Sequence, residues 1–185
     1  MGKCSLNLRK AVIFDRDGIV NSTVLRGGQP TPPRTLNEFE IKKGFKNLYE
    51  HALSLDYRLF IATNQPDVHR GLTTREFVQS LHDMIISEYD QIEEIVTCFH
   101  DNIHNCSCRK PRPGMVLYLE NKYGLNLSKS FFIGDRVGDV LCGNSAGCKT
   151  IFVDYKYAES VGPINADYIV SSVEDVLPFL SGEKR

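Results

Sequence analysis

Six short apolar segments, five of them followed by a stretch of helical character, constrain the fold of this chain more than any other feature. Short continuous runs of apolar or β-branched residues are typical of strands that are buried on both faces, as in a parallel sheet. We expect strands at 10–14, 57–62, 94–98, 130–133, 150–153 and 167–170. Helical windows lie between and after them, near 43–54, 73–90, 113–123, 138–146 and 172–180. This alternation predicts right-handed βαβ units and therefore a doubly wound parallel α/β sheet.

Local signals mark some of the boundaries of these elements. Thr73 or Thr74 can cap the second helical window, with Glu76 at capping-box spacing from Thr73. Gly124 and Gly147 are placed to end the third and fourth windows. The segment 21–39 is a long irregular stretch with three prolines and two glycines. Loops of that length usually serve a function or are disordered.

Length and charge exclude several classes of protein. The chain has 185 residues, so we expect one domain over 1–185. Its formal charge is −1, with no basic footprint for nucleic acid and no net charge for an anionic membrane. The apolar runs are far shorter than the roughly 20 residues that span a bilayer, and the first ten residues lack the apolar core of a secretory signal. We expect a cytoplasmic monomer with neither nucleic acid nor membrane as a partner.

Polar residues able to bind ligands follow four of the predicted strands. In an open parallel sheet, ligands bind at the carboxyl ends of the strands, so these residues should converge on one edge. The segments concerned are Asp15-Arg16-Asp17-Gly18, Thr63-Asn64-Gln65, Cys98 with His100, and Gly134-Asp135-Arg136 with Asp139.

Asp15 and Asp17 form a carboxylate pair at the end of the first strand. Side chains two residues apart in extended backbone point the same way, and two such carboxylates repel unless a cation lies between them. Asp135 could supply a third carboxylate, and an all-oxygen site of this kind suits Mg²⁺. The alternative is that 15–18 is only a turn, because Asp and Gly are common turn residues.

A second cluster lies at 98–108 and reads C-x-H-x5-C-x-C. Cys98, His100, Cys106 and Cys108 make the Cys₃His set of a tetrahedral structural zinc site. His104 could replace His100, and reduced cysteines or a disulfide are the alternatives to a metal. The other cysteines, at 4, 142 and 148, have no partner pattern. Zinc in this loop would order the Arg109–Lys110 segment that follows, without taking part in the chemistry.

Four motifs in order resemble the haloacid-dehalogenase-type phosphatases. Residues 14–21 resemble the DxDGxxN signature, and 62–65 resemble the second motif of that family. Lys110 resembles the third motif, and 134–139 resemble the fourth, GDxxxD. The resemblance is greatest to the branch of D-glycero-D-manno-heptose 1,7-bisphosphate phosphatases and histidinol-phosphate phosphatases, which share the CxH…CxCRKP loop. That loop favours His100 over His104.

The resemblance implies a role for each matching residue. Asp15 would be the nucleophile that forms an aspartyl-phosphate, and Asp17 the general acid and base. Thr63 and Lys110 would hold the phosphoryl oxygens. Mg²⁺ would be bound by Asp15, the backbone carbonyl of Asp17 and Asp135. An anionic nucleophile needs such charge neutralisation to approach a phosphate.

The same resemblance indicates an open site. The gaps between the motifs leave no room for a cap domain, so segment 21–39 and the zinc loop should cover the pocket. Arg109 would recognise the substrate, and the further candidates are Asn21, Arg26, Asn64 and Gln65. The implied activity is a Mg²⁺-dependent phosphatase of a small phosphorylated metabolite, above all a sugar phosphate such as heptose 1,7-bisphosphate. A histidinol-phosphate phosphatase and a zinc-stabilised binding module without activity are the alternatives.

The heptose phosphatases differ from this chain in two segments, 63–71 and segment 21–39 with its Thr31-Pro32-Pro33-Arg34 stretch. In the first they usually read TNQSGIARG, whereas this chain reads Thr63-Asn64-Gln65-Pro66-Asp67-Val68-His69-Arg70-Gly71. Pro66 removes a backbone N–H that could have met a substrate oxygen. Both differences lie where the far end of the substrate should sit, so they leave phosphatase chemistry intact and put the heptose assignment in question.

Overall fold

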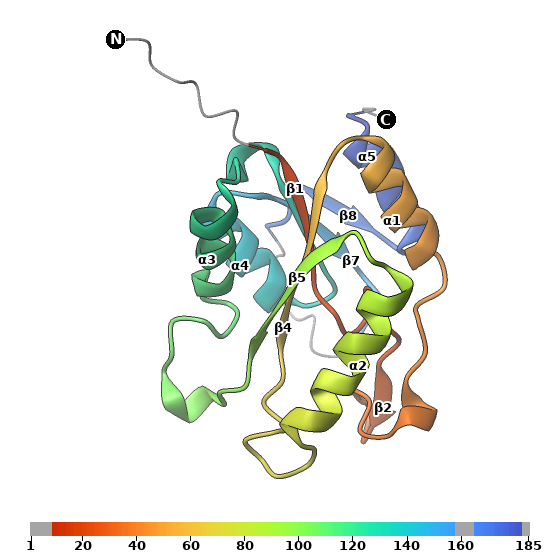
Figure 1. The fold of residues 1–185 in the computed structure, drawn as a ribbon, viewed down its shortest axis with the longest axis vertical. Helices are drawn as coiled ribbons and strands as arrows, with labels where there is room; N and C mark the ends of the chain where they lie inside the picture. The colour runs from red at the N-terminus through yellow and green to blue at the C-terminus, as the bar shows by residue number, and fades with distance from the viewer. Residues whose placement is uncertain (1–8, 158–164, 183–185) are drawn as a thin grey trace.

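The computed structural model describes residues 9–157 and 165–182. Six parallel strands form one sheet in the order β5-β4-β1-β6-β7-β8 (Figure 1). Their bounds are β1 (Ala11–Phe14), β4 (Arg58–Asn64), β5 (Ile92–Cys98), β6 (Phe131–Gly134), β7 (Lys149–Val153) and β8 (Tyr168–Val170). The predicted doubly wound α/β sheet is confirmed, and each of its six strands overlaps the expected range.

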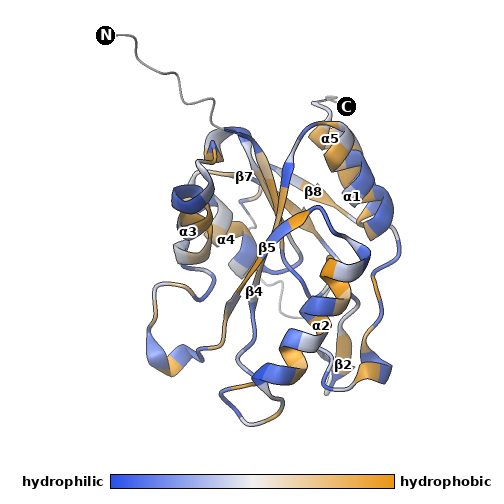
Figure 2. Ribbon diagram, in the orientation of Figure 1, coloured by the Kyte–Doolittle hydropathy of each residue, from blue (hydrophilic) through white to orange (hydrophobic). Residues whose placement is uncertain are grey.

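Helices cover both faces of this sheet, and two apolar clusters fill the two interfaces (Figures 1 and 2). Along β1, Val12 and Phe14 face one cluster while Ala11 and Ile13 face the other. This alternation is what a strand buried on both faces requires. The first cluster packs beneath α1 (Phe45–Ser54), α2 (Arg75–Glu88) and α5 (Leu177–Leu180), and the second beneath α3 (Gly114–Tyr123) and α4 (Val137–Ala146).

The ends of the elements follow the expected signals with one correction. Gly124 and Gly147 end α3 and α4 in the left-handed conformation, as predicted. Thr74, and not Thr73, caps α2, because its side chain accepts a hydrogen bond from the backbone N–H of Phe77. The window 172–180 is wrong as one helix: a 3₁₀ turn at Glu174–Val176 precedes the four-residue α5.

Segment 21–39 contains structure that the sequence analysis did not predict. Strands β2 (Val24–Arg26) and β3 (Gln29–Thr31) pair as an antiparallel hairpin, followed by a 3₁₀ turn at Leu36–Glu38. Gly27 and Gly28 form the turn with φ of 57° and 78°, values that glycine adopts without strain. No cap domain interrupts the elements between 9 and 157. Among the described residues, no helix is long and apolar enough to cross a membrane.

Candidate active site

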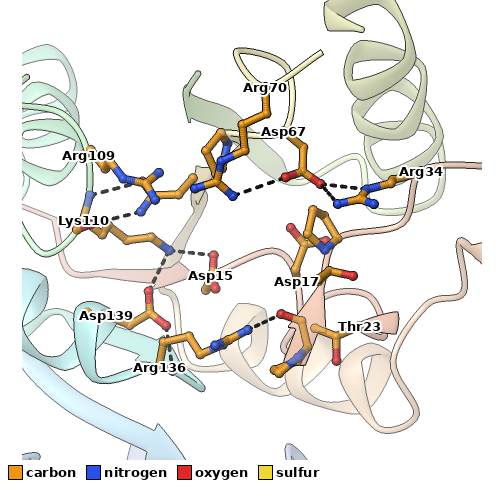
Figure 3. Close-up of a pocket in the computed structure, with 16 residues that line it drawn as sticks. Asp15, Asp17, Thr23, Arg34, Asp67, Arg70, Arg109, Lys110, Arg136 and Asp139 are labelled. Atoms are coloured by element: carbon orange, nitrogen blue, oxygen red, sulfur yellow. Dashed lines mark hydrogen bonds and ion pairs between the residues drawn. The ribbon is translucent and has the colours of Figure 1, made fainter. Parts of the chain in front are cut away.

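A pocket of about 340 Å³ opens at the carboxyl ends of β1, β4 and β6 (Figure 3). Its floor carries residues of the predicted motifs, and its walls come from segment 21–39, the loop after β4 and the segment that follows the cysteine loop. The lining residues are Asp15, Asp17, Thr23, Pro30, Thr31, Pro32, Arg34, Asn64, Pro66, Asp67, Arg70, Arg109, Lys110, Arg136, Gly138 and Asp139.

Lys110 lies at the centre of a buried charge cluster on the pocket floor (Figure 3). Its Nζ is 2.6 Å from Oδ1 of Asp15 and 2.7 Å from Oδ1 of Asp139, and it also donates to the backbone carbonyl of Ala62. All three charged side chains are nearly inaccessible to solvent. One ammonium group therefore neutralises part of the charge of two carboxylates that solvent does not screen.

Asp135 lies next to this cluster with both carboxylate oxygens buried, and neither has a hydrogen-bond partner among the described residues. Oxygens of Asp15, Asp135 and Asp139 all lie within 4.8 Å of one another. Leaving a buried carboxylate unpaired is costly, and a divalent cation removes that cost. The three carboxylates form a site of hard oxygen ligands that fits Mg²⁺.

The pKa shifts at this cluster reflect the same excess of negative charge. Burial, then the charge of Asp139, raises the pKa of Asp15 to about 7, although Lys110 opposes the shift. Burial and the charge of Asp15 raise the pKa of Asp135 well above its usual range. Burial acts to lower the pKa of Lys110, but the two carboxylates beside it raise that pKa. A cation between the carboxylates would favour their ionised forms.

Asp17 is held by three donor side chains. The Arg16 guanidinium, which is fully buried, donates from Nη2 to Oδ1 at 2.9 Å and to Oδ2 at 3.0 Å. Asn21 donates to Oδ1 at 3.0 Å and Gln65 to Oδ2 at 2.6 Å. Arg16 is fixed in turn by His82 of α2, whose Nε2 is 3.1 Å from Nη1. The carboxyl group of Asp17 is therefore pre-positioned at the pocket wall.

The substrate and phosphate residues predicted from sequence divide into two groups. Asn64 and Arg109 line the pocket. Asn64 also holds the Lys110 backbone, since its side chain accepts from the N–H and donates to the carbonyl, both at 3.1 Å. Arg109 donates to Asn102 and to the carbonyl of His100, so the cysteine loop orients it.

The second group does not line the pocket. Asn21, Gln65 and Thr63 are buried behind Asp17, and Gln65 donates to both Asp17 and Thr63. Arg26 pairs with Glu38 at 2.6 Å and donates to the carbonyl of Pro32, so it braces segment 21–39 from within. The structure thus gives these four residues supporting contacts and no direct place on the pocket surface.

The cysteine loop brings together the four predicted zinc ligands. The Sγ atoms of Cys98 and Cys108 are 3.3 Å apart, Cys98 and Cys106 3.8 Å, and Cys106 and Cys108 3.5 Å. Nδ1 of His100 is 3.3 Å from Sγ of Cys108 and 3.6 Å from that of Cys98. A tetrahedron with zinc–sulfur bonds of about 2.3 Å has edges of roughly 3.8 Å. Nδ1 of His104 lies instead beside the backbone of Asp101, so the histidine that joins the thiols is His100.

Several pocket residues were not identified from sequence. Asp139 was noted as part of the fourth motif without a role, and its contact with Lys110 emerges only in three dimensions. Arg34, Asp67, Arg70 and Arg136 also line the pocket without having been predicted to. Asp67 and Arg70 lie in the segment 63–71 that departs from the pattern of the heptose phosphatases, Arg34 lies in segment 21–39, and Arg136 lies in the fourth motif.

The chain is similar to several known proteins. A family model described as HAD-hydrolase-like matches residues 107–176. A D-glycero-beta-D-manno-heptose-1,7-bisphosphate 7-phosphatase from Helicobacter pylori is 35% identical over 149 residues, which cover 78% of this chain and 83% of that protein. A D-glycero-alpha-D-manno-heptose-1,7-bisphosphate 7-phosphatase from Campylobacter jejuni is 32% identical over 148 residues, which cover 78% and 81%.

Solved structures share the whole fold. A crystal structure of D,D-heptose 1,7-bisphosphate phosphatase from B. bronchiseptica, complexed with magnesium and phosphate, has a TM-score of 0.81 and 25% identity, and the match covers 95% of this chain and 99% of that one. A putative HAD-like phosphatase from Mesorhizobium loti has a TM-score of 0.74 at 20% identity, and the match covers 100% and 92%. The second likeness concerns the fold alone.

Proposed function

Because this chain belongs to the haloacid-dehalogenase-like phosphatases, we propose that it hydrolyses a sugar phosphate through an aspartyl-phosphate formed on Asp15. The observation that carries the proposal is the buried set of Asp15, Asp135 and Asp139 around Lys110 at the carboxyl ends of the strands. Phosphoryl transfer needs positioning and charge neutralisation more than covalent chemistry, and this set offers both. The curated relatives and the magnesium and phosphate complex support the same reaction class.

The roles of the catalytic residues follow from their places. Asp15 would attack phosphorus, and the Lys110 ammonium beside it would bind a phosphoryl oxygen. Mg²⁺, bound by Asp15, Asp135 and the backbone carbonyl of Asp17, would supply the further positive charge that the transferring group requires. Asp17 would give a proton to the leaving oxygen and later take one from water. Its fixed position at the pocket wall suits this exchange, because Arg16, Asn21 and Gln65 keep it in place.

The relatives' names support D-glycero-D-manno-heptose 1,7-bisphosphate as the first substrate to test. One relative carries the beta anomer in its name and another the alpha anomer, so both anomers belong in that test. The threonines, the asparagine and the arginines that line the pocket fit a hydroxyl-bearing, anionic molecule of this kind.

We also propose that the cysteine loop binds structural zinc through Cys98, His100, Cys106 and Cys108. A full set of four protein ligands leaves no open position for a substrate or water. The structure describes no disulfide among these cysteines. Zinc binding needs reduced thiols, which supports a cytoplasmic location.

We propose that the protein is a monomer, which light scattering coupled to gel filtration would test.

A phosphate-release assay tests the proposed reaction. The wild-type protein with Mg²⁺ should release phosphate from the heptose bisphosphate, and the parallel arms are histidinol phosphate and common sugar phosphates. Asp15→Asn should abolish release while the thermal unfolding curve stays close to that of the wild type. Asp90→Asn, in an exposed turn outside the pocket, is the matched control. Retained turnover by Asp15→Asn would show that Asp15 is not the nucleophile. If the wild-type protein released phosphate from none of these phosphomonoesters, the zinc-stabilised binding module without activity would be the remaining alternative.

A further inference from the structure

Asp67 is a buried acid in the loop on the pocket rim that also contains exposed residues. It lies between β4 and α2 and is only 2% exposed, whereas the neighbouring His69 and Arg70 are exposed. It stands in the segment where this chain departs from the heptose phosphatase pattern. An acid this buried needs a charged partner, so its contacts indicate what the loop is built to hold.

Two arginines of the pocket wall meet at Asp67 (Figure 3). Arg34, from segment 21–39, places Nε and Nη2 each 2.9 Å from Oδ2 of Asp67. Arg70 places Nη1 3.6 Å from Oδ1, and its Nε and Nη2 reach Asp101 at 2.7 and 2.8 Å. A continuous chain of ion pairs therefore joins segment 21–39, the loop after β4 and the cysteine loop at 98–108.

This chain of ion pairs leaves positive charge on the rim. Three guanidinium groups, from Arg34, Arg70 and Arg109, line the pocket there against the two carboxylates of Asp67 and Asp101. The Nε and Nη2 atoms of the Arg34 guanidinium group face Asp67. No described residue accepts a hydrogen bond from its Nη1, so this nitrogen can donate to a ligand. The guanidinium fork matches the oxygens of an anion, and a fork that is already ordered loses less conformational freedom on binding.

We propose that Asp67 is a positioning residue that holds Arg34 and Arg70 as a clamp for a second anionic group, at the end of the substrate opposite the phosphate that is cleaved. The inference rests on the proposed phosphatase function and adds its selectivity: a sugar bisphosphate is preferred to the corresponding monophosphate. Arg34 and Arg70 bind the distal anion, and Asp67 acts through them.

The measured quantity is the ratio of kcat/KM for D-glycero-D-manno-heptose 1,7-bisphosphate to kcat/KM for the 7-phosphate of the same sugar. Arg34→Gln removes the fork and should lower this ratio by about 10- to 100-fold, the range expected for one charge-assisted contact. Arg34→Lys keeps the charge without the fork and should recover only part of the ratio. Arg58→Gln is the matched control, since Arg58 pairs with Glu93 at the opposite end of the strands and should leave the ratio unchanged.

Asp67→Asn distinguishes a role of Asp67 in positioning the two arginines from an effect of its negative charge on the rim. It raises the positive charge of the rim, so electrostatic attraction alone would lower KM for the bisphosphate and raise the ratio. If Asp67 positions the clamp, KM for the bisphosphate rises instead and the ratio falls, with little change in kcat. A raised or unchanged ratio in Asp67→Asn, or a wild-type ratio near one, would overturn the clamp. Absence of any wild-type turnover would overturn the proposed function itself, which is a distinguishable result.

Discussion

Gly18 leaves the space that the Asp135 carboxylate occupies. A Cβ atom added at Gly18 would overlap with both the Oδ2 and Cγ atoms of Asp135. Gly18 also has φ of 100°, a conformation that side chains disfavour. The glycine of the first motif thus allows the strand β6 carboxylate to approach the chain beside Asp17, where we propose that Mg²⁺ binds.

Gly18→Ala should therefore displace Asp135 and weaken Mg²⁺ binding. We expect the Mg²⁺ concentration needed for half-maximal turnover to rise at least tenfold, equivalent to about 1.4 kcal/mol. Gly27→Ala is the matched control: Gly27 also has positive φ, but no atom of a described residue lies within 4 Å of its added Cβ. Equal Mg²⁺ dependence of the two variants would contradict the role of Gly18 in the cradle.

Lys110→Met should impair both turnover and stability. Loss of one preorganised charge at the transferring group costs on the order of 10²–10³ in kcat. The change also leaves Asp15 and Asp139 buried without their cation, which should destabilise the fold by about 3–5 kcal/mol. Mg²⁺ should restore part of that stability, measurable by urea unfolding with and without the ion. Lys129→Met, on an exposed turn, should change neither quantity.

The sheet could be predicted because its four central strands, β1, β4, β6 and β7, are short apolar runs that are largely buried, and the catalytic motifs because they stand at the ends of such strands. The β2–β3 hairpin was missed because its strands have three residues each and one contains Pro30, too little for a periodic signal.

The contacts of individual side chains at the site could not be predicted from the sequence. Thr63 lies near the end of β4 and Gln65 directly after it, yet the Gln65 side chain donates to Asp17 and to Thr63 and does not line the pocket. Arg34 and Asp67 are 33 positions apart in sequence and meet only through folding. Motif spacing places backbone segments at the site, but it does not decide which polar side chains face the ligand and which support a neighbour.

Removal of zinc should lower activity through the position of Arg109 and Lys110. Cys106→Ala removes one ligand, and we expect loss of bound zinc, a lower melting temperature and reduced kcat/KM that excess Mg²⁺ does not restore. Zinc content by mass spectrometry of the intact protein accompanies the kinetics. Cys148→Ala, a buried cysteine away from the loop, should keep its zinc. A folded, zinc-free Cys106→Ala protein with full activity would show that the loop does not organise the site.

His82 should make the stability of the protein fall as the pH falls below about 6.5. Burial, then the charge of Arg16, lowers the pKa of His82 to about 3, from an ordinary value of 6.5. Between these values the unfolded chain binds a proton that the folded chain does not, so stability is full above pH 6.5 and is lost as the pH falls toward 3. The contribution of one such group is at most about 1.4 kcal/mol per pH unit.

His82→Leu should reduce this slope between pH 6.5 and 5, measured as the free energy of unfolding in urea. At pH 7 the variant should itself be less stable by about 1–3 kcal/mol, because Nη1 of the buried Arg16 loses its acceptor. Since Arg16 holds Asp17, kcat should also fall, and more for an alkyl phosphate than for an aryl phosphate, whose leaving group needs less help from an acid. His69→Asn replaces an exposed histidine and is the control for the slope. A slope in His82→Leu equal to that of the wild type would show that His82 takes up its proton in the folded protein as readily as in the unfolded chain.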